Sequence, residues 1–161
     1  MSGAADREPA APPLESKRFE KPTEALGCAT LLLSTARPFD RMRFGALARA
    51  LNGQIHRGHY LFAAQGRRLV GYVGWALCTE EVGRGWAHGR YRPSHEDCLA
   101  GDCFVGLTWY GESPRITFFL MRRCRALYPG VKVFGRREYG DGRPPRPMEW
   151  VNPVPSSEGS G

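Results

Sequence analysis

Two apolar strands joined by a tight turn constrain the fold of this chain more than any other feature. Residues 60–64 and 69–78 are apolar runs, and the polar turn Gln65-Gly-Arg-Arg68 separates them, a pattern typical of a β-hairpin. Gly71 and Gly74 interrupt the second run. Because glycine weakens a strand, this pair indicates either a ligand that lies close to the sheet or a bulge that serves only packing. The residues alone leave both interpretations open.

Composition limits the classes to which the chain can belong. With 161 residues, of which 42% are hydrophobic, one folded domain is expected rather than two. The chain has no apolar run of about 18 residues, so no membrane span is expected. The N-terminus lacks the apolar core of a secretory signal, which favours a cytoplasmic protein.

The cysteines and histidines predict neither disulfides nor a metal centre. Five cysteines without regular spacing indicate reduced thiols rather than a disulfide framework. Four candidate ligands lie close together in the sequence, but their spacing matches no common zinc module. They are His88, His95, Cys98 and Cys103. We therefore expect no bound metal.

The formal net charge of +7 is concentrated in the C-terminal third. Residues 115–146 hold nine basic and two acidic side chains, a surplus that equals the charge of the whole chain. Such a field favours an acidic partner, although a solvated basic face is the simpler interpretation. The arginines are spread over several elements and match no nucleic-acid recognition motif, so nucleic acid is not an expected partner.

Hydrophobic periodicity and turn residues predict an α/β fold of the α+β type. Residues 1–21 and 152–161 are rich in Pro, Ala, Ser and Gly and are predicted to be disordered tails, which leaves 22–151 as a single domain. Helices are predicted over 23–33, 40–51, 79–88 and 113–127, and further strands over 103–110, 131–134 and 148–151. Their order predicts a mixed, largely antiparallel sheet flanked by helices.

Several short motifs occur in an order that resembles one family, the RTX toxin-activating lysine acyltransferases. They cover about residues 24–138 and are Ala25-Leu-Gly27, the link 34–41, Tyr60-Leu-Phe62, the strand 69–76, Glu80-Glu-Val82, Gly101-Asp102, Tyr110-Gly-Glu112 and Leu127-Tyr-Pro129. The resemblance implies a GNAT-like fold in a cytoplasmic, often dimeric enzyme. Such an enzyme moves a fatty acyl group from acyl carrier protein to an internal lysine of an RTX-type protoxin. It also implies no bound cofactor, with the acyl-acyl carrier protein as co-substrate.

The expected donor is a carrier protein rather than coenzyme A. Many GNAT enzymes hold the coenzyme A pyrophosphate with an R/Q-x-x-G-x-G/A loop before a helix. The one match here, 137–142, runs into Arg143-Pro-Pro145, where no helix can start. An acidic carrier protein suits the basic C-terminal third. The candidate donor-binding residues are Gly71, Gly74, Trp75, Trp109, Arg122 and Arg123.

The catalytic residues of the family are replaced in this chain. A lysine must lose its ammonium proton before it attacks a thioester, so a general base is required. The family histidine aligns with Asp40 and the family aspartate falls near Gly106. Asp40 is the first candidate base, with an N-cap of the second helix as the alternative interpretation. His59 and Glu112 are the substitutes, and a catalytically degenerate binding module for carrier protein or protoxin is the alternative function.

Overall fold

A computed structural model of the chain describes residues 9–139 and 141–157, and its centre is one six-stranded sheet. Neighbouring strands are antiparallel except β4 and β5, which are parallel. The strands lie in sequence order and are β1 (Leu14–Lys17), β2 (Tyr60–Gln65), β3 (Arg68–Cys78), β4 (Cys103–Gly111), β5 (Lys132–Arg137) and β6 (Arg146–Val151). The expected mixed, largely antiparallel sheet is therefore confirmed.

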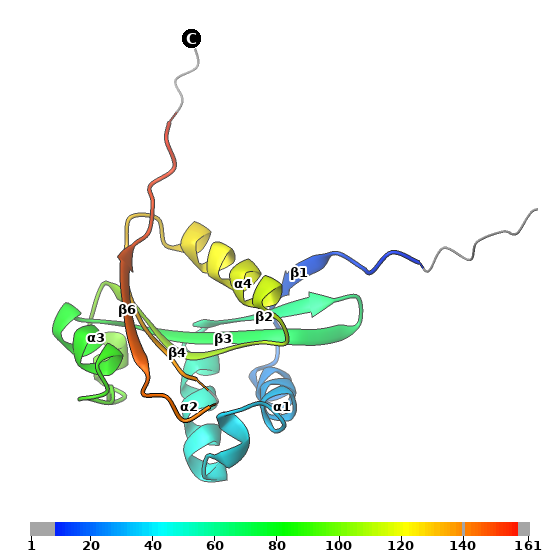
Figure 1. Cartoon of the computed structure of the whole chain (residues 1–161), viewed down its shortest axis with the longest axis horizontal. Helices are drawn as coiled ribbons and strands as arrows, with labels where there is room; N and C mark the ends of the chain where they lie inside the picture. The colour runs from blue at the N-terminus through cyan, green and yellow to red at the C-terminus, as the bar shows by residue number, and fades with distance from the viewer. Residues whose placement is uncertain (1–8, 140, 158–161) are drawn as a thin grey trace, which may run out of the picture.

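Helices cover both faces of this sheet (Figure 1). The described residues form α1 (Pro22–Leu33), α2 (Phe44–His56), α3 (Glu80–Ala87) and α4 (Pro114–Leu127), with the short 3₁₀ helices η1 (Phe39–Arg41) and η2 (Asp97–Leu99). Helix α4 lies on one face, and α1 and α2 lie on the other (Figure 1). This arrangement is the GNAT-like α/β architecture that was expected.

Alternation along β3 divides the core between the two faces. Tyr72 is fully buried among the side chains of α1 and α2. Val73 and Trp75 are fully buried in the cluster that contains α4. Successive strand residues point to opposite faces, so β3 carries both halves of the core.

The two glycines of β3 serve packing. A Cβ atom on Gly71 would lie 2.8 Å from Ile116 Cγ2 of α4, and one on Gly74 would overlap the Gln54 side chain of α2. The register of the sheet also shifts directly after Gly74. The protein's own side chains fill the space beside both glycines, so the packing interpretation of the hairpin accounts for them without a ligand.

The structure differs from the predicted tails at residues 14–17 and at Asn152, and residues 1–8 and 158–161 lie outside the described part of the chain. Residues 14–17 form β1, which pairs antiparallel with residues 62–65 of β2. At the other end, Asn152 is buried and its N–H donates to the Val131 carbonyl at 2.9 Å. Residues 14–17 and Asn152 thus pair with residues far away in the chain. The composition of a segment does not reveal such pairing.

The start of the second helix also differs from the prediction. Asp40 lies in η1, and Met42 has an extended backbone with ψ of 149° that separates η1 from α2. Helix α2 starts at Phe44 with Arg43 as its N-cap residue, and it continues past Gly53 to His56. Asp40 therefore does not cap this helix, and the N-cap interpretation of Asp40 is wrong.

Candidate functional site

The sheet opens where β4 and β5 part. The two strands pair only through Phe104 with Val133 and Val105 with Phe134. Directly beyond this pairing, Leu107 is an extra residue in β4, because Trp75 pairs with Gly106 and Gly74 with Thr108. A bulge of this kind bends its strand and increases the local twist. The divergence leaves a cleft of about 1250 Å³.

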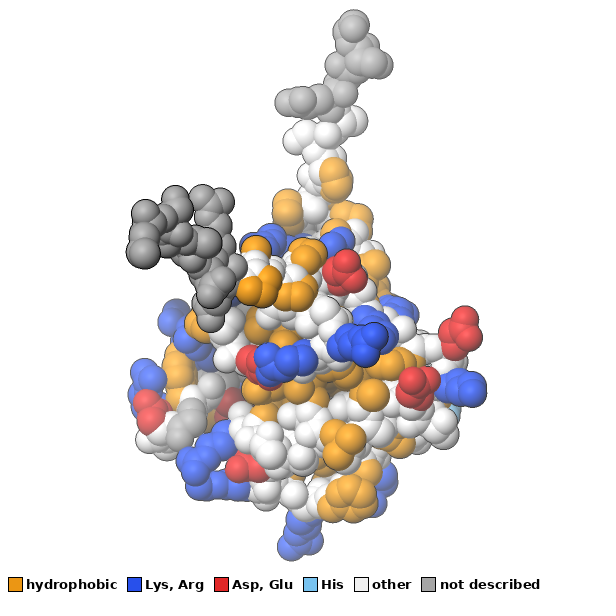
Figure 2. Space-filling model, turned by 90° about the vertical axis from the view of Figure 1, so that its right-hand side faces the viewer, with side chains coloured by type: hydrophobic (Ala, Val, Ile, Leu, Met, Phe, Trp, Pro, Cys, Tyr) orange, Lys and Arg blue, Asp and Glu red, His pale blue; other side chains and the backbone are white. Residues whose placement is uncertain are grey.

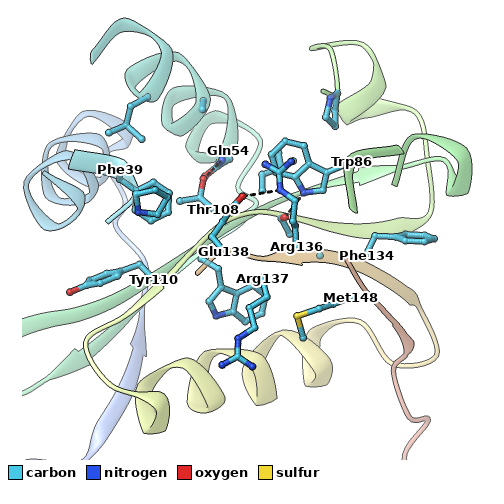
Figure 3. A pocket seen from close by; sticks show the side chains of 18 of the residues that line it. Phe39, Gln54, Trp86, Thr108, Tyr110, Phe134, Arg136, Arg137, Glu138 and Met148 are labelled. Atoms are coloured by element: carbon cyan, nitrogen blue, oxygen red, sulfur yellow. Dashed lines mark hydrogen bonds and ion pairs between the residues drawn. The ribbon is translucent and has the colours of Figure 1, made fainter. Parts of the chain in front are cut away.

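This cleft passes between the two strands and is lined from both faces of the sheet (Figure 3). On one face its wall comes from α2, and on the other it comes from Thr117, Phe118 and Met121 of α4. Apolar side chains line the part between them, among them Trp109, Val133, Met148 and Trp150. A cleft in which apolar walls combine with convergent polar groups is typical of a small-molecule site.

A buried polar network fixes the α2 wall. The Tyr72 hydroxyl donates to Gln54 Oε1 at 2.9 Å, and Gln54 Nε2 donates to Thr108 Oγ1 at 2.9 Å. Gln54 is 1% exposed and Thr108, which lines the cleft, is 5% exposed. Burial raises the pKa of Tyr72, so its hydroxyl stays a hydrogen-bond donor. Figure 3 shows Gln54 and Thr108 beside each other at this wall.

An arginine is held at the edge of the cleft near α3. Trp86 Nε1 donates to the Gly106 carbonyl at 2.9 Å. The Arg136 guanidinium lies 4.3 Å from the centre of a Trp86 ring and pairs with Glu138 at 3.0 Å. Figure 3 shows Trp86 and Arg136 together on this side. The stacking orients a cation toward the opening between β4 and β5.

The three candidate catalytic residues lie at different distances from the cleft. Asp40 is exposed on η1, between Phe39 and Met42, both of which line the cleft. Glu112 lines the cleft, but its carboxylate pairs with Arg68 at 3.1 Å. Of these two residues only Glu112 lines the cleft, and Asp40 is a sequence neighbour of lining residues without lining the cleft itself.

His59 does not line the cleft. Its ring stacks on Trp75, with the ring centres 5.9 Å apart. Burial, and then the charges of Arg57 and Arg18, lower the pKa of this histidine. The imidazole is therefore neutral near pH 7, but its place between Trp75 and α2 separates it from the opening of the sheet.

Of the candidate donor-binding residues, only Trp109 lines the cleft. Trp75 is fully buried, and its indole N–H donates to the Tyr128 hydroxyl at 3.0 Å. Arg122 and Arg123 are exposed on α4, outside the lining. Their interpretation as donor-binding residues therefore requires a partner that covers the surface of α4.

The loop before β4 supplies lining residues that the sequence did not reveal as part of this site. Ser94, His95 and Cys98 line the cleft. The Asp97 carboxylate holds this loop by accepting from Ser94 N at 2.8 Å and Ser94 Oγ at 2.9 Å. The Ser-x-x-Asp spacing is a local hydrogen-bonding pattern, but nothing in it indicates which strands the loop faces.

Cys98 is expected to be the more reactive of two buried thiols. A hydrogen bond with Cys78 and the charge of Arg57 lower the pKa of Cys98 against the effect of burial, whereas burial raises the pKa of Cys124 to about 12. Thiolates are the reactive form. At pH 7 iodoacetamide should label Cys98 at least about tenfold faster than Cys124, measured by peptide mass spectrometry. Equal labelling rates at the two cysteines would show that Cys98 is not the more reactive thiol.

The fold is of the GNAT-like α/β class, and the cleft between β4 and β5 is its candidate functional site. Within residues 9–139 and 141–157, no three His, Cys, Asp or Glu side chains are grouped to hold a metal ion. No helix in the described part of the chain is long and apolar enough to cross a membrane. No family model matches the chain, and no curated protein matches it.

Proposed function

We propose that this chain is a protein-lysine acyltransferase of the toxin-activating type, which transfers a fatty acyl group from acyl carrier protein to an internal lysine of an RTX-type protoxin. The observation that carries the proposal is the cleft between β4 and β5, which is apolar in the middle and lined from both faces of the sheet. Such a cleft allows a thioester and an amine to meet from opposite sides. Holding two reactants together in the correct orientation contributes a large part of the rate enhancement of a group-transfer reaction.

The chemistry requires few protein groups. The neutral lysine amine attacks the thioester carbonyl, a C–N bond forms, the C–S bond breaks, and the carrier thiol takes the electron pair. One proton must leave the lysine. Asp40 is the proposed base because it is exposed and lies in the chain between Phe39 and Met42, two residues that line the cleft. An aspartate in this position accepts the proton once the acceptor covers it and excludes water.

The carrier protein is proposed to dock on the α4 side. Arg122 and Arg123 are exposed there, and Arg115 lies in the first turn of the same helix. An acidic partner is steered toward such a surface, and its acyl chain can then enter between Phe118 and Met121. The proposal includes action in the cytoplasm, where acyl carrier protein is loaded, and a homodimer as the form in solution.

A binding module for carrier protein or protoxin is the second candidate function. It is favoured by the residues at the family's catalytic positions, because Asp40 stands where that family has histidine and Gly106 lies near its aspartate position. Gly106 lines the cleft without a side chain. A Cβ atom there would lie 3.4 Å from the Trp109 ring, so the space admits a small side chain that the sequence does not provide.

Co-expression with acyl carrier protein and a candidate protoxin separates the two functions. The acyltransferase predicts that the intact mass of the protoxin rises by that of a fatty acyl group. If the protoxin mass stays unchanged while a histidine-containing relative acylates the same protoxin, the enzyme is excluded and the binding module remains.

Asp40→Ala is expected to lower the acyl-transfer rate by at least about 100-fold, which is the usual size of a general-base contribution. The far-UV spectrum and thermal midpoint should not change, because the Asp40 side chain is exposed and α2 is capped elsewhere. The rate is measured with purified acyl carrier protein by protoxin mass. Asp40→Asn is the matched control that keeps shape and removes charge. Full activity in either variant removes Asp40 from the mechanism.

A further inference from the structure

The mouth of the cleft on the α2 face is rich in arginine. We call this set the arginine rim, and it consists of Arg37, Arg49, Arg57, Arg92 and Arg136. Two carboxylates line the cleft: Glu138 pairs with Arg136 at 3.0 Å, and Glu112 pairs with Arg68, which is outside the rim. Among the described residues, the other four arginines form no ion pair within 4.0 Å. The rim therefore has several cations in excess, next to the opening of the sheet.

The mouth on the α4 face has a different character. Thr117, Phe118 and Met121 line it, and Phe118 is 57% exposed. Figure 2 shows one side of the molecule, where hydrophobic side chains lie across the middle of the face and basic side chains are scattered around them. Arg137 also lines the cleft and lies on the α4 side in Figure 3. The α4 mouth thus combines apolar side chains with one arginine, whereas the α2 mouth has the five arginines of the rim.

Two members of the rim are held in place before any partner arrives. Arg57 Nη2 donates to the Trp75 carbonyl at 3.1 Å, and Arg136 stacks on Trp86. Fixed guanidinium groups lose less conformational entropy when they bind carboxylates, and their planar donors match a carboxylate in two parallel hydrogen bonds. Arg49 and Arg92 are exposed, and they widen the basic surface around this fixed pair.

We propose that the arginine rim binds an acidic segment of the acceptor protein, whose carboxylates flank the lysine that enters the cleft. This inference rests on the proposed acyl transfer, because it takes the α2 mouth as the acceptor side. A lysine without acidic neighbours is repelled by the rim, whereas glutamates beside it pair with the arginines. The rim selects acceptor lysines by their acidic surroundings.

A nucleic acid is the competing occupant of a basic surface. Single-stranded nucleic acids bind by stacking bases on free aromatic faces in addition to charge. Three aromatic residues line the cleft on this side, Phe39, Trp86 and Tyr110, and Arg136 covers one face of the Trp86 ring. Phe39 and Tyr110 are half-buried and pack against the core cluster of α1 and α2. Their rings are therefore less available for stacking than the guanidinium groups are for ion pairs, which favours peptide carboxylates.

The test is the binding of a labelled peptide in which glutamates flank one lysine, measured by fluorescence anisotropy with the full chain. The wild type should bind it more tightly than the same peptide with glutamines, and affinity should fall as salt rises. Arg49→Glu/Arg92→Glu should weaken binding by at least about tenfold. Lys17→Glu/Arg67→Glu makes the same charge change at exposed positions outside the cleft lining and should keep the affinity. Equal affinities for both peptides, an equal loss in the two double variants, or tighter binding of single-stranded RNA would overturn the inference.

This measurement does not depend on catalysis. If the acidic peptide binds at the rim but never gains acyl mass, the acyltransferase proposal fails and the acidic docking surface remains. If acyl transfer occurs equally on the acidic and the glutamine peptide, the transfer reaction remains and the rim inference fails.

Discussion

Gly135→Trp should lower binding of fatty-acyl carrier protein by at least about 100-fold and leave the protein folded. Gly135 lies in β5 just beyond the last pairing with β4, and it lines the cleft. No atom lies within 4 Å of the position where its Cβ would be. An indole at this position would fill part of the cleft in which the acyl chain is proposed to bind. It would not displace a core side chain. The acyl chain could then bury less surface in the cleft, and the affinity for the acyl carrier protein should fall.

Gly27→Trp is the matched control for this substitution. Gly27 is exposed on α1, and no atom lies within 4 Å of its Cβ position either. Both variants should have thermal midpoints close to that of the wild type, and only Gly135→Trp should lose the donor. Carrier-protein affinity is measured by calorimetry. Unchanged affinity in Gly135→Trp would mean that the acyl chain binds elsewhere.

Gly74→Ala should reduce the free energy of unfolding by about 2–4 kcal/mol, since a displaced polar network leaves each buried hydroxyl unpaired at a cost of about 1–3 kcal/mol. The new methyl group would occupy the position of the Gln54 amide. That amide accepts from Tyr72 and donates to Thr108. Because Thr108 lines the cleft, donor affinity should fall together with stability. Urea unfolding and the same binding assay measure the two effects.

A double-mutant cycle tests the cause of this loss. Gln54→Ala removes the group that collides with the new methyl, so the double variant should be more stable than the sum of the two single losses predicts. Gly27→Ala is the control in a helix, where the exchange is ordinarily stabilising by about 0.5–1 kcal/mol. Strictly additive losses for Gly74 and Gln54 would show that the collision is not the mechanism.

Local patterns predicted those elements whose partners are close in the chain. The hairpin of β2 and β3 followed from alternation around a polar turn, and α4 followed from Ser113 with Pro114 at the first helical position. Strand β1 was missed because four residues of mixed polarity carry no alternation of their own. It is ordered by the edge of β2, more than 40 residues away.

The cleft could not be predicted from the sequence because it depends on the register of β4 against β3 and on where β4 and β5 stop pairing. Leu107 is an ordinary apolar strand residue in the sequence, and only the register against β3 makes it an extra one. The same holds for Gly74, whose partner Gln54 belongs to another helix. Trp109 and Glu112 were placed at the site through the family resemblance, whereas His95 and Cys98 reach it through a loop whose path no local pattern defines.

Photocrosslinking tests most directly whether the acyl chain binds in the cleft between β4 and β5. Acyl carrier protein is loaded with a fatty acid that carries a photoreactive diazirine, mixed with the full chain, irradiated, and the crosslinked peptides are identified by mass spectrometry. The cleft predicts crosslinks to Trp109, Met121 and Val133, which line it between β4, α4 and β5, and their loss in Gly135→Trp. Crosslinks confined to residues outside the cleft, or crosslinks unchanged in Gly135→Trp, would show that the acyl chain does not bind in the cleft.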